Sequence, residues 1–147
     1  MNCLNPYTKI ILIMTTITTN PESPLEVVKA FFAAMTTLDY DKALSYVSDD
    51  CEYDYLSMPG AKVFGPAGIR AVLEPFFAPT LENEFVVLRE ATQGHIVFRE
   101  RLDRHRLPNG WLELPVTGVM EVHNGRITLW HDYFNLPTIA PMFAPQS

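Results

Sequence analysis

The sequence predicts an α+β domain: a strongly curved, mixed but mainly antiparallel β-sheet, closed on one side by three or four helices from the first half of the chain. Two observations carry this prediction. Residues 23–77 contain stretches with apolar residues at helical spacing, whereas residues 84–135 alternate as strands joined by hairpin turns. Helices and strands that occupy separate parts of a chain pack as segregated layers. We therefore expect the concave face of the sheet to line a pocket.

The length and composition fit one such domain. The chain has 147 residues, of which 48% are hydrophobic and 19% charged, so it can bury a core. A net charge of −6 gives no basis for binding nucleic acid or an anionic membrane surface. Cys3 and Cys51 are too few and too far apart for a disulfide framework or a zinc site. We expect two free thiols in a reducing cytoplasm.

We divide the chain into three parts. Residues 21–137 form the single α+β domain, and the proline-rich residues 138–147 form a C-terminal arm over the surface. Residues 1–20 are a tail or an extra N-terminal segment, whose apolar run is too short for a transmembrane helix. This segment is either an upstream extension of the reading frame, with Met14 as an alternative start, or an additional strand that packs on the domain or on a partner.

The first helix is expected from Pro24 to about Thr37. Ser23 and Glu26 form a capping box, with the proline at the first helical position. A second, shorter helix follows, capped by an aspartate at 39 or 41. The apolar side of the first helix is expected to comprise Leu25, Val28, Phe31, Phe32 and Met35.

A third helix begins at Gly65-Pro66 and is expected to kink or end near Pro75, which cannot donate a backbone hydrogen bond. Before it, residues 51–56 alternate as a strand with Tyr53 and Tyr55 on one side, and residues 58–60 are a turn signal. The later strands are predicted at residues 85–90, 95–106, 111–122 and 126–135, with hairpin turns at 108–110 and 123–125.

Charged residues on one face of the strand at 95–106 are the most informative feature of the sequence. Arg101 and Asp103 are two residues apart and so share a face, in an apolar neighbourhood. Buried charge is unfavourable unless it is paired, and we expect Asp132 of the last strand to share the arginine. With Tyr53, these side chains reach one cavity from three strands.

Two aspartates bridged by an arginine suit general acid–base chemistry. Like charges held close together tend to retain one proton between them, so one aspartate can take a proton from water while the other gives one to a leaving oxygen. The Tyr53 hydroxyl can hold a water molecule. The alternative interpretation of Arg101 and its carboxylates is a buried salt bridge that sets strand register. The four histidines show no metal-ligand spacing, so we predict no metal site. We interpret His105 as solvated near a hairpin; the alternative is that it shares the face of Arg101 and Asp103.

Three segments together resemble the limonene-1,2-epoxide hydrolase family: residues 100–103, residues 114–118, and residues 125–134 with their Trp-His-Asp-Tyr-Phe run. The similarity extends from about Ser23 to Pro137. The wider superfamily includes ketosteroid isomerase-like and polyketide cyclase-like (SnoaL-like, NTF2-like) proteins with the same cone-shaped fold. The resemblance implies a cone-shaped pocket and a cofactor-free hydrolase, usually a homodimer, that acts on a small epoxide and water.

The resemblance also implies catalytic roles. Asp132 is the base that activates water, Asp103 protonates the epoxide oxygen, and Arg101 bridges the two. Tyr53 helps to hold the water, and the ring opens in a single step to a vicinal diol. Two departures from the family are visible: Tyr55 stands where asparagine is a further water ligand, and His131 stands where arginine is usual. The histidine should point away from the cavity.

The remaining pocket residues are apolar, which suits a hydrophobic cyclic or terpene-like epoxide. Two other functions stay open: an isomerase or cyclase that uses one aspartate to move a proton on a ketone, and a non-catalytic domain that binds an apolar ligand. For Leu114, Trp130 and Phe134, ordinary core positions are the alternative. The predicted substrate-binding residues are Tyr55, Phe32, Met35, Phe85, Leu114, Val116, Trp130 and Phe134.

Overall fold

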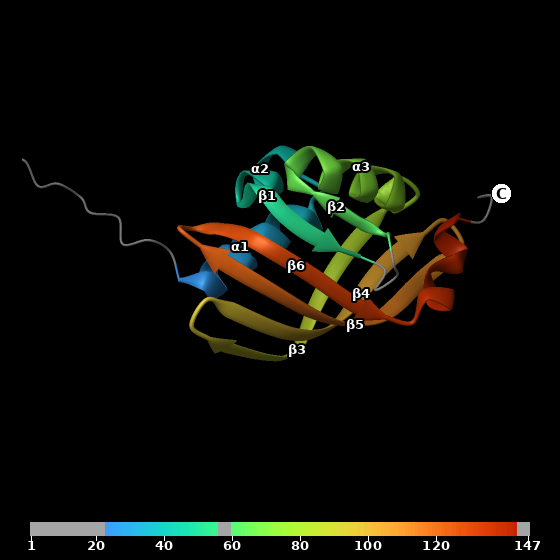
Figure 1. Ribbon diagram of the computed structural model, residues 1–147. Coiled ribbons are helices and arrows are strands. Elements are labelled where there is room, and N and C mark those ends of the chain that lie inside the picture. The colour runs from blue at the N-terminus through green and yellow to red at the C-terminus, as the bar shows by residue number, and fades with distance from the viewer. Residues whose placement is uncertain (1–22, 56–59, 144–147) are drawn as a thin grey trace, which may run out of the picture.

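The computed structural model describes residues 23–55 and 60–143 (Figure 1). The predictions for residues 1–20 with Cys3, for positions 58 and 59 of the expected turn, and for the end of the C-terminal arm lie outside the described residues. Within them, a curved sheet carries helices over its concave side (Figure 1), so the predicted α+β class is confirmed.

The sheet has six strands among the described residues, in the order β2-β1-β6-β5-β4-β3. All neighbours are antiparallel except β1 and β6, which run parallel, so the sheet is mixed as predicted. Hairpins join β3 to β6 into the expected meander. The strands are β1 Val47–Asp54, β2 Lys62–Phe64, β3 Glu82–Gln93, β4 Ile96–Leu107, β5 Gly110–His123 and β6 Arg126–Phe134.

Sequence signals at the helix ends are borne out. In the capping box, Ser23 Oγ accepts from the Glu26 backbone N–H at 3.3 Å, and the glutamate accepts from the Ser23 N–H at 3.2 Å. Pro75 lies inside α3, which ends two residues later. No helix in the described ranges is both long and apolar enough to cross a membrane. The helices are α1 Pro24–Thr36, α2 Tyr40–Ser45, α3 Gly65–Phe77 and the 3₁₀ helix η1 Leu136–Phe143.

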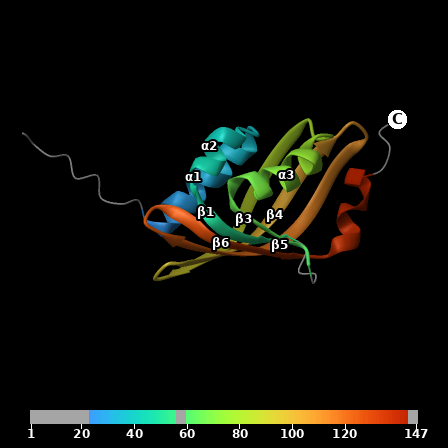
Figure 2. The same cartoon turned by 45° about the horizontal axis from the view of Figure 1, so that its top comes forward.

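The concave face of the sheet holds the core. The buried side of α1 packs against β3, β4, β5 and β6, and Figure 2 shows the helices on one side of the bent sheet. At the far end of the sheet, η1 buries Ile139 and Met142 against Leu107, Leu114 and Val116. A pocket is lined by residues of α1, α3 and η1 together with residues of β4, β5 and β6.

Three strands differ from the prediction. β1 begins at Val47, four residues before the predicted 51–56, because the buried Val47 already pairs with Ile127 of β6. β2, which pairs with β1, has three residues, too few for alternation to be visible in the sequence. β3 extends three residues beyond each end of the predicted 85–90. At its first residue Arg106 of β4 donates to Glu82 at 2.8 Å, and its last three residues are exposed while their backbones pair with β4. Neither end carries buried apolar side chains, so apolar alternation does not reveal the full length of the strand.

Candidate functional site

Strand β4 turns its charged face inward, as predicted. From Val97 to Leu107 every second side chain is buried, and its neighbours on the other face are exposed or half-buried. Arg101 and Asp103 are only 2% and 5% exposed, and Asp132 of β6 is 6% exposed. Three charged groups are therefore removed from water in the same part of the core.

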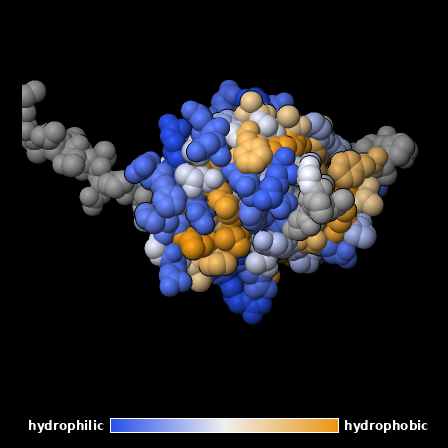
Figure 3. All heavy atoms as spheres, in the orientation of Figure 1, coloured by the Kyte–Doolittle hydropathy of each residue, from blue (hydrophilic) through white to orange (hydrophobic). Residues whose placement is uncertain are grey.

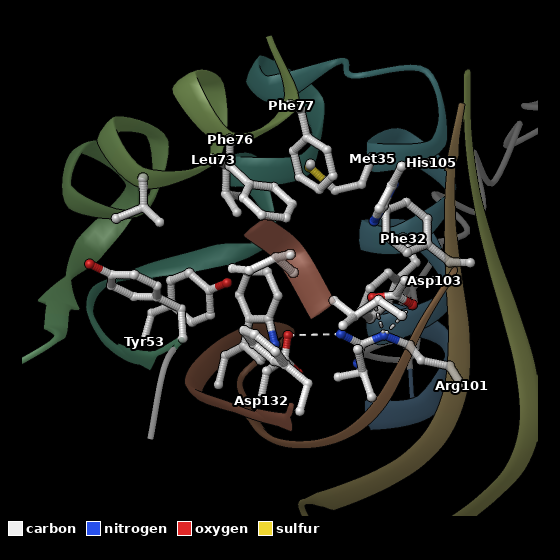
Figure 4. Close-up of a pocket in the computed structure, with 18 of the residues that line it drawn as sticks. Phe32, Met35, Tyr53, Leu73, Phe76, Phe77, Arg101, Asp103, His105 and Asp132 are labelled. Atoms are coloured by element: carbon white, nitrogen blue, oxygen red, sulfur yellow. Dashed lines mark hydrogen bonds and ion pairs between the residues drawn. The ribbon is translucent and has the colours of Figure 1, made fainter. Parts of the chain in front are cut away.

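The three charges form one hydrogen-bonded unit. Arg101 Nε donates to Asp103 Oδ1 at 2.8 Å and to Oδ2 at 3.1 Å, and Arg101 Nη2 donates to Asp132 Oδ2 at 2.8 Å (Figure 4). The planar guanidinium thus fixes the orientation of both carboxylates, as its fork geometry allows. The predicted bridging of two aspartates by one arginine is confirmed as geometry.

Gly118 makes this bridge possible, and the sequence analysis did not identify it as a site residue. Strand β5 lies between β4 and β6, so the Arg101 side chain must pass over β5 to reach Asp132. It passes at Gly118, which pairs directly with Asp132. A Cβ built there would lie 2.5 Å from Arg101 Nη1 and 2.7 Å from Asp132 Oδ1. A glycine in the interior of a strand is the sequence signal of such a close approach.

The electrostatics follow from burial and from the shared charge. Burial raises the pKa of Asp103 to about 6; Arg101 opposes this shift, and Asp132 adds to it. Burial acts to lower the pKa of Arg101, but the two carboxylates outweigh it and the pKa is raised, so the guanidinium stays charged. The site therefore holds one fixed positive charge and an acid that retains a proton in the weakly acidic range.

Tyr53 lies close to this unit. Its hydroxyl pKa is raised well above 10, by burial first and by Asp132 next, so it stays protonated and can donate a hydrogen bond. Figure 4 shows Asp132 on the side of the site toward Tyr53, with Asp103 beyond it. The Tyr53 ring stacks on the Trp130 ring with the two centroids 3.9 Å apart, and the centroid of the Tyr55 ring lies 5.5 Å from that of Tyr53. The buried Trp130 Nε1 has no hydrogen-bond partner among the described residues.

A cavity of about 430 Å³ opens beside these groups. All four predicted catalytic residues and all eight predicted substrate-binding residues line it. Figure 4 shows residues of α3 across the cavity from Arg101 and Asp132. The predicted substrate-binding residues included none from α3 and none from the C-terminal residues, which were expected to form a surface arm. Further wall residues from these two parts of the chain include Leu73, Phe76, Phe77, Ile139 and Phe143.

The two histidines nearest the site have opposite surroundings. His131 faces away from the cavity, as expected, and bonds Glu52 at 2.9 Å. The prediction that His105 is solvated is wrong: it is 1% exposed, because alternation on β4 continues inward as far as Leu107. Its Nδ1 lies 2.8 Å from Asn83 Oδ1, and it lines the cavity. Burial and the Arg101 charge lower its pKa to about 4.

The described residues contain no group of three or more His, Cys, Asp or Glu side chains arranged to hold a metal ion. The polar side chains around the Arg101 bridge are two carboxyl groups, a guanidinium and a phenol. Such a set can bind water, accept one proton and donate another. The surrounding wall is apolar and suits a compact hydrophobic ligand.

Comparisons with known proteins point to one family. The model of the limonene-1,2-epoxide hydrolase catalytic domain matches residues 22–144. Epoxide hydrolase EphG of Mycobacterium tuberculosis (strain ATCC 25618 / H37Rv) is 29% identical over 109 residues, which cover 74% of this chain and 71% of that protein.

Solved structures agree with this match. The structure of an M. tuberculosis LEH-like epoxide hydrolase is 27% identical with a TM-score of 0.67, covering 81% of this chain and 87% of that one. A Shewanella putrefaciens CN-32 protein described as a SnoaL-like polyketide cyclase has a TM-score of 0.71 at 17% identity, covering 82% of this chain and 95% of that one. The second likeness concerns the fold alone.

Proposed function

Because the chain belongs to the limonene-1,2-epoxide hydrolase family, we propose that it is an epoxide hydrolase that adds water to a hydrophobic, cyclic or terpene-like epoxide and releases a vicinal diol. The observation that carries the proposal is the buried guanidinium of Arg101, which holds Asp103 and Asp132 together in the wall of an apolar cavity. The apolar cavity can bind the substrate, and the two carboxyl groups can act as a base and an acid.

In the proposed step, Asp132 takes a proton from a water molecule as the water oxygen forms a bond to one epoxide carbon. The bond from that carbon to the ring oxygen breaks, and the oxygen takes a proton from Asp103. The diol leaves with Asp132 protonated and Asp103 ionised, and one proton moved from the first to the second restores the site. Arg101 remains charged throughout and keeps both carboxyl groups in place.

The assignment of acid and base has separate support. Asp103 has a pKa raised to about 6, so it carries a proton over a pH range in which an ordinary aspartate is ionised. Tyr53 lies toward Asp132 in Figure 4, and its protonated hydroxyl can donate to a water molecule beside that carboxylate. Tyr55 occupies the position of the family's asparagine, so a phenol replaces the amide as the next polar group around this water.

The test is a panel of cyclic and terpene epoxides, assayed for diol with the wild type, Asp132→Asn and Asp103→Asn. We expect near-complete loss in both variants and no loss in Asp50→Asn, a matched change at an exposed position of β1. A single turnover in ¹⁸O-labelled water should place the label in the diol, because no enzyme ester forms. Absence of turnover by the wild type, or full activity of Asp132→Asn, would reject the assignment.

A second candidate is an isomerase or cyclase that moves a proton on a ketone with one carboxyl group. The raised pKa of Asp103 favours it, since such a group can both give and take a proton near neutrality. This activity would need only one essential aspartate. Unequal losses in Asp103→Asn and Asp132→Asn, with turnover of a ketone and of no epoxide, would favour the second candidate.

We also propose that the protein acts as a homodimer. The outer face of the sheet, seen in Figure 3, carries apolar residues over β5 and β6, and Phe98 and Tyr133 on this face are 44% and 50% exposed. Light scattering on the purified protein tests the oligomeric state, and Phe98→Glu should yield a monomer if this face pairs.

We propose the cytoplasm as the location of the protein, a reducing compartment in which the buried Cys51 stays a free thiol.

A further inference from the structure

His105 is a buried polar group in the cavity wall that the proposed hydrolysis does not use. It follows Asp103 by two residues on β4, so both side chains project from the same face of the strand. Its ring packs edge-on against Phe77 at 5.2 Å and Phe85 at 6.0 Å. A single imidazole thus interrupts an otherwise apolar part of the wall, about 7 Å along the strand from the acid.

The protonation of this imidazole follows from a chain of hydrogen bonds. The Thr80 hydroxyl donates to the Phe77 carbonyl at 2.8 Å, so its oxygen is left to accept from Asn83 Nδ2 at 3.0 Å. This orients the amide of Asn83, which is itself buried, with Oδ1 toward His105. Because that oxygen can only accept, Nδ1 of the histidine must carry the hydrogen. The fixed tautomer has a lone pair on Nε2.

His105 lines the cavity, and the part of the chain that the structure describes offers no hydrogen-bond donor to its Nε2. With its pKa lowered to about 4, His105 is neutral near pH 7 and keeps the lone pair. Nδ1 is turned toward Asn83 on β3, and Nε2 projects from the other side of the ring. If His105 had only a packing role, its Nε2 would lie in an apolar wall without a hydrogen-bond donor.

We propose that His105 is a specificity-determining residue whose Nε2 accepts a hydrogen bond from a hydroxyl group of the substrate. The preferred substrates are then hydrophobic epoxides that also carry a hydroxyl group, with the epoxide oxygen at Asp103 and the hydroxyl at His105. This substrate class rests on the proposed function. A cationic donor is disfavoured by the nearby charge of Arg101, and a carboxylate has no hydrogen to give.

The inference is tested by binding, which needs no turnover. Isothermal titration calorimetry compares 4-tert-butylcyclohexanol with its methyl ether, which has the same apolar body but no donor. We expect the alcohol to bind the wild type about fivefold more tightly than the ether, and the ratio to fall to about one in His105→Leu. His123→Leu, a change at an exposed histidine, should keep the wild-type ratio. Equal ratios in the wild type and His105→Leu overturn the proposal.

Nitrogen-15 NMR of the wild-type histidines gives a second readout that needs no folded variant. In the ligand-free protein, the Nε2 resonance of His105 should have the chemical shift of an unprotonated nitrogen. Addition of the alcohol should shift this Nε2 resonance, and addition of the ether should not. A resonance that both ligands leave unchanged assigns His105 to packing and overturns the proposal. If the proposed function is wrong, the epoxide assay will show it, because the wild type will not turn over any epoxide. In that case the binding ratio still decides whether His105 recognises a hydroxyl.

Discussion

Gly118→Ala adds one methyl group at the point where Arg101 crosses β5. The new Cβ would lie 2.5 Å from Arg101 Nη1 and 2.7 Å from Asp132 Oδ1, whereas non-bonded heavy atoms rest at about 3.5 Å or more. Both charged groups must therefore retreat by about 1 Å. The 2.8 Å bond from Arg101 Nη2 to Asp132 Oδ2 would then exceed the range of a hydrogen bond.

The expected losses follow from these distances. A displacement of about 1 Å at catalytic groups lowers activity about a hundredfold, so kcat/KM for epoxide hydrolysis should fall by about that factor. Overpacking of a well-packed interior lowers the free energy of unfolding by about 2 kcal/mol, which corresponds to a fall in Tm of about 6 °C for a domain of this size. Activity should thus fall far more than stability alone would explain at the assay temperature.

Steady-state kinetics and thermal unfolding of the same preparations measure both effects. The matched control is Gly68→Ala in α3, where the nearest atom to a new Cβ is the Val63 side chain at 3.3 Å and no charged group is in contact. The control should keep its activity. If Gly118→Ala hydrolyses epoxides as fast as the wild type, the Arg101 bridge is not needed for catalysis and the proposed chemistry is refuted.

Three other outcomes are expected. In a pH profile, kcat/KM should decline as the pH rises through about 6, because Asp103 must be protonated to donate; a flat profile would argue against it as the acid. Because folding raises this pKa from 3.8, the stabilisation from Asp103 is full below pH 3.8 and is lost as the pH rises through about 6, which chemical denaturation of wild type and Asp103→Asn can measure by difference. Arg101→Lys should lower kcat about a hundredfold, since a single ammonium cannot hold both carboxylates in a fork; retained kcat would count against the bridge. Tyr55→Asn should raise kcat about threefold by adding an amide ligand for the water near Tyr53 and Asp132, and an unchanged kcat would show that this position does not limit water binding.

Much of the fold could be predicted because its signals are local. The capping box at Ser23 and Glu26 depends only on residues three apart, and it forms as expected. The turn after β5 has Asn124 and Gly125 at φ of 51° and 72°, the left-handed pair that an asparagine-glycine hairpin requires. Strand β2 and the ends of β3 escaped prediction because β2 has only three residues and the ends of β3 carry no buried apolar side chains; both are held by pairing with neighbouring strands.

By itself the sequence determined that Arg101 and Asp103 share a buried face, because strand alternation is a property of the backbone, and it made Asp132 the natural third member through the cost of burying an unmatched charge. Only the tertiary structure decided that the arginine reaches Asp132 across Gly118, and that His105 is buried with no hydrogen bond to its Nε2 from the described residues. These facts depend on which strands are neighbours and where each side chain ends. Packing sets both, and no spacing along the chain encodes them.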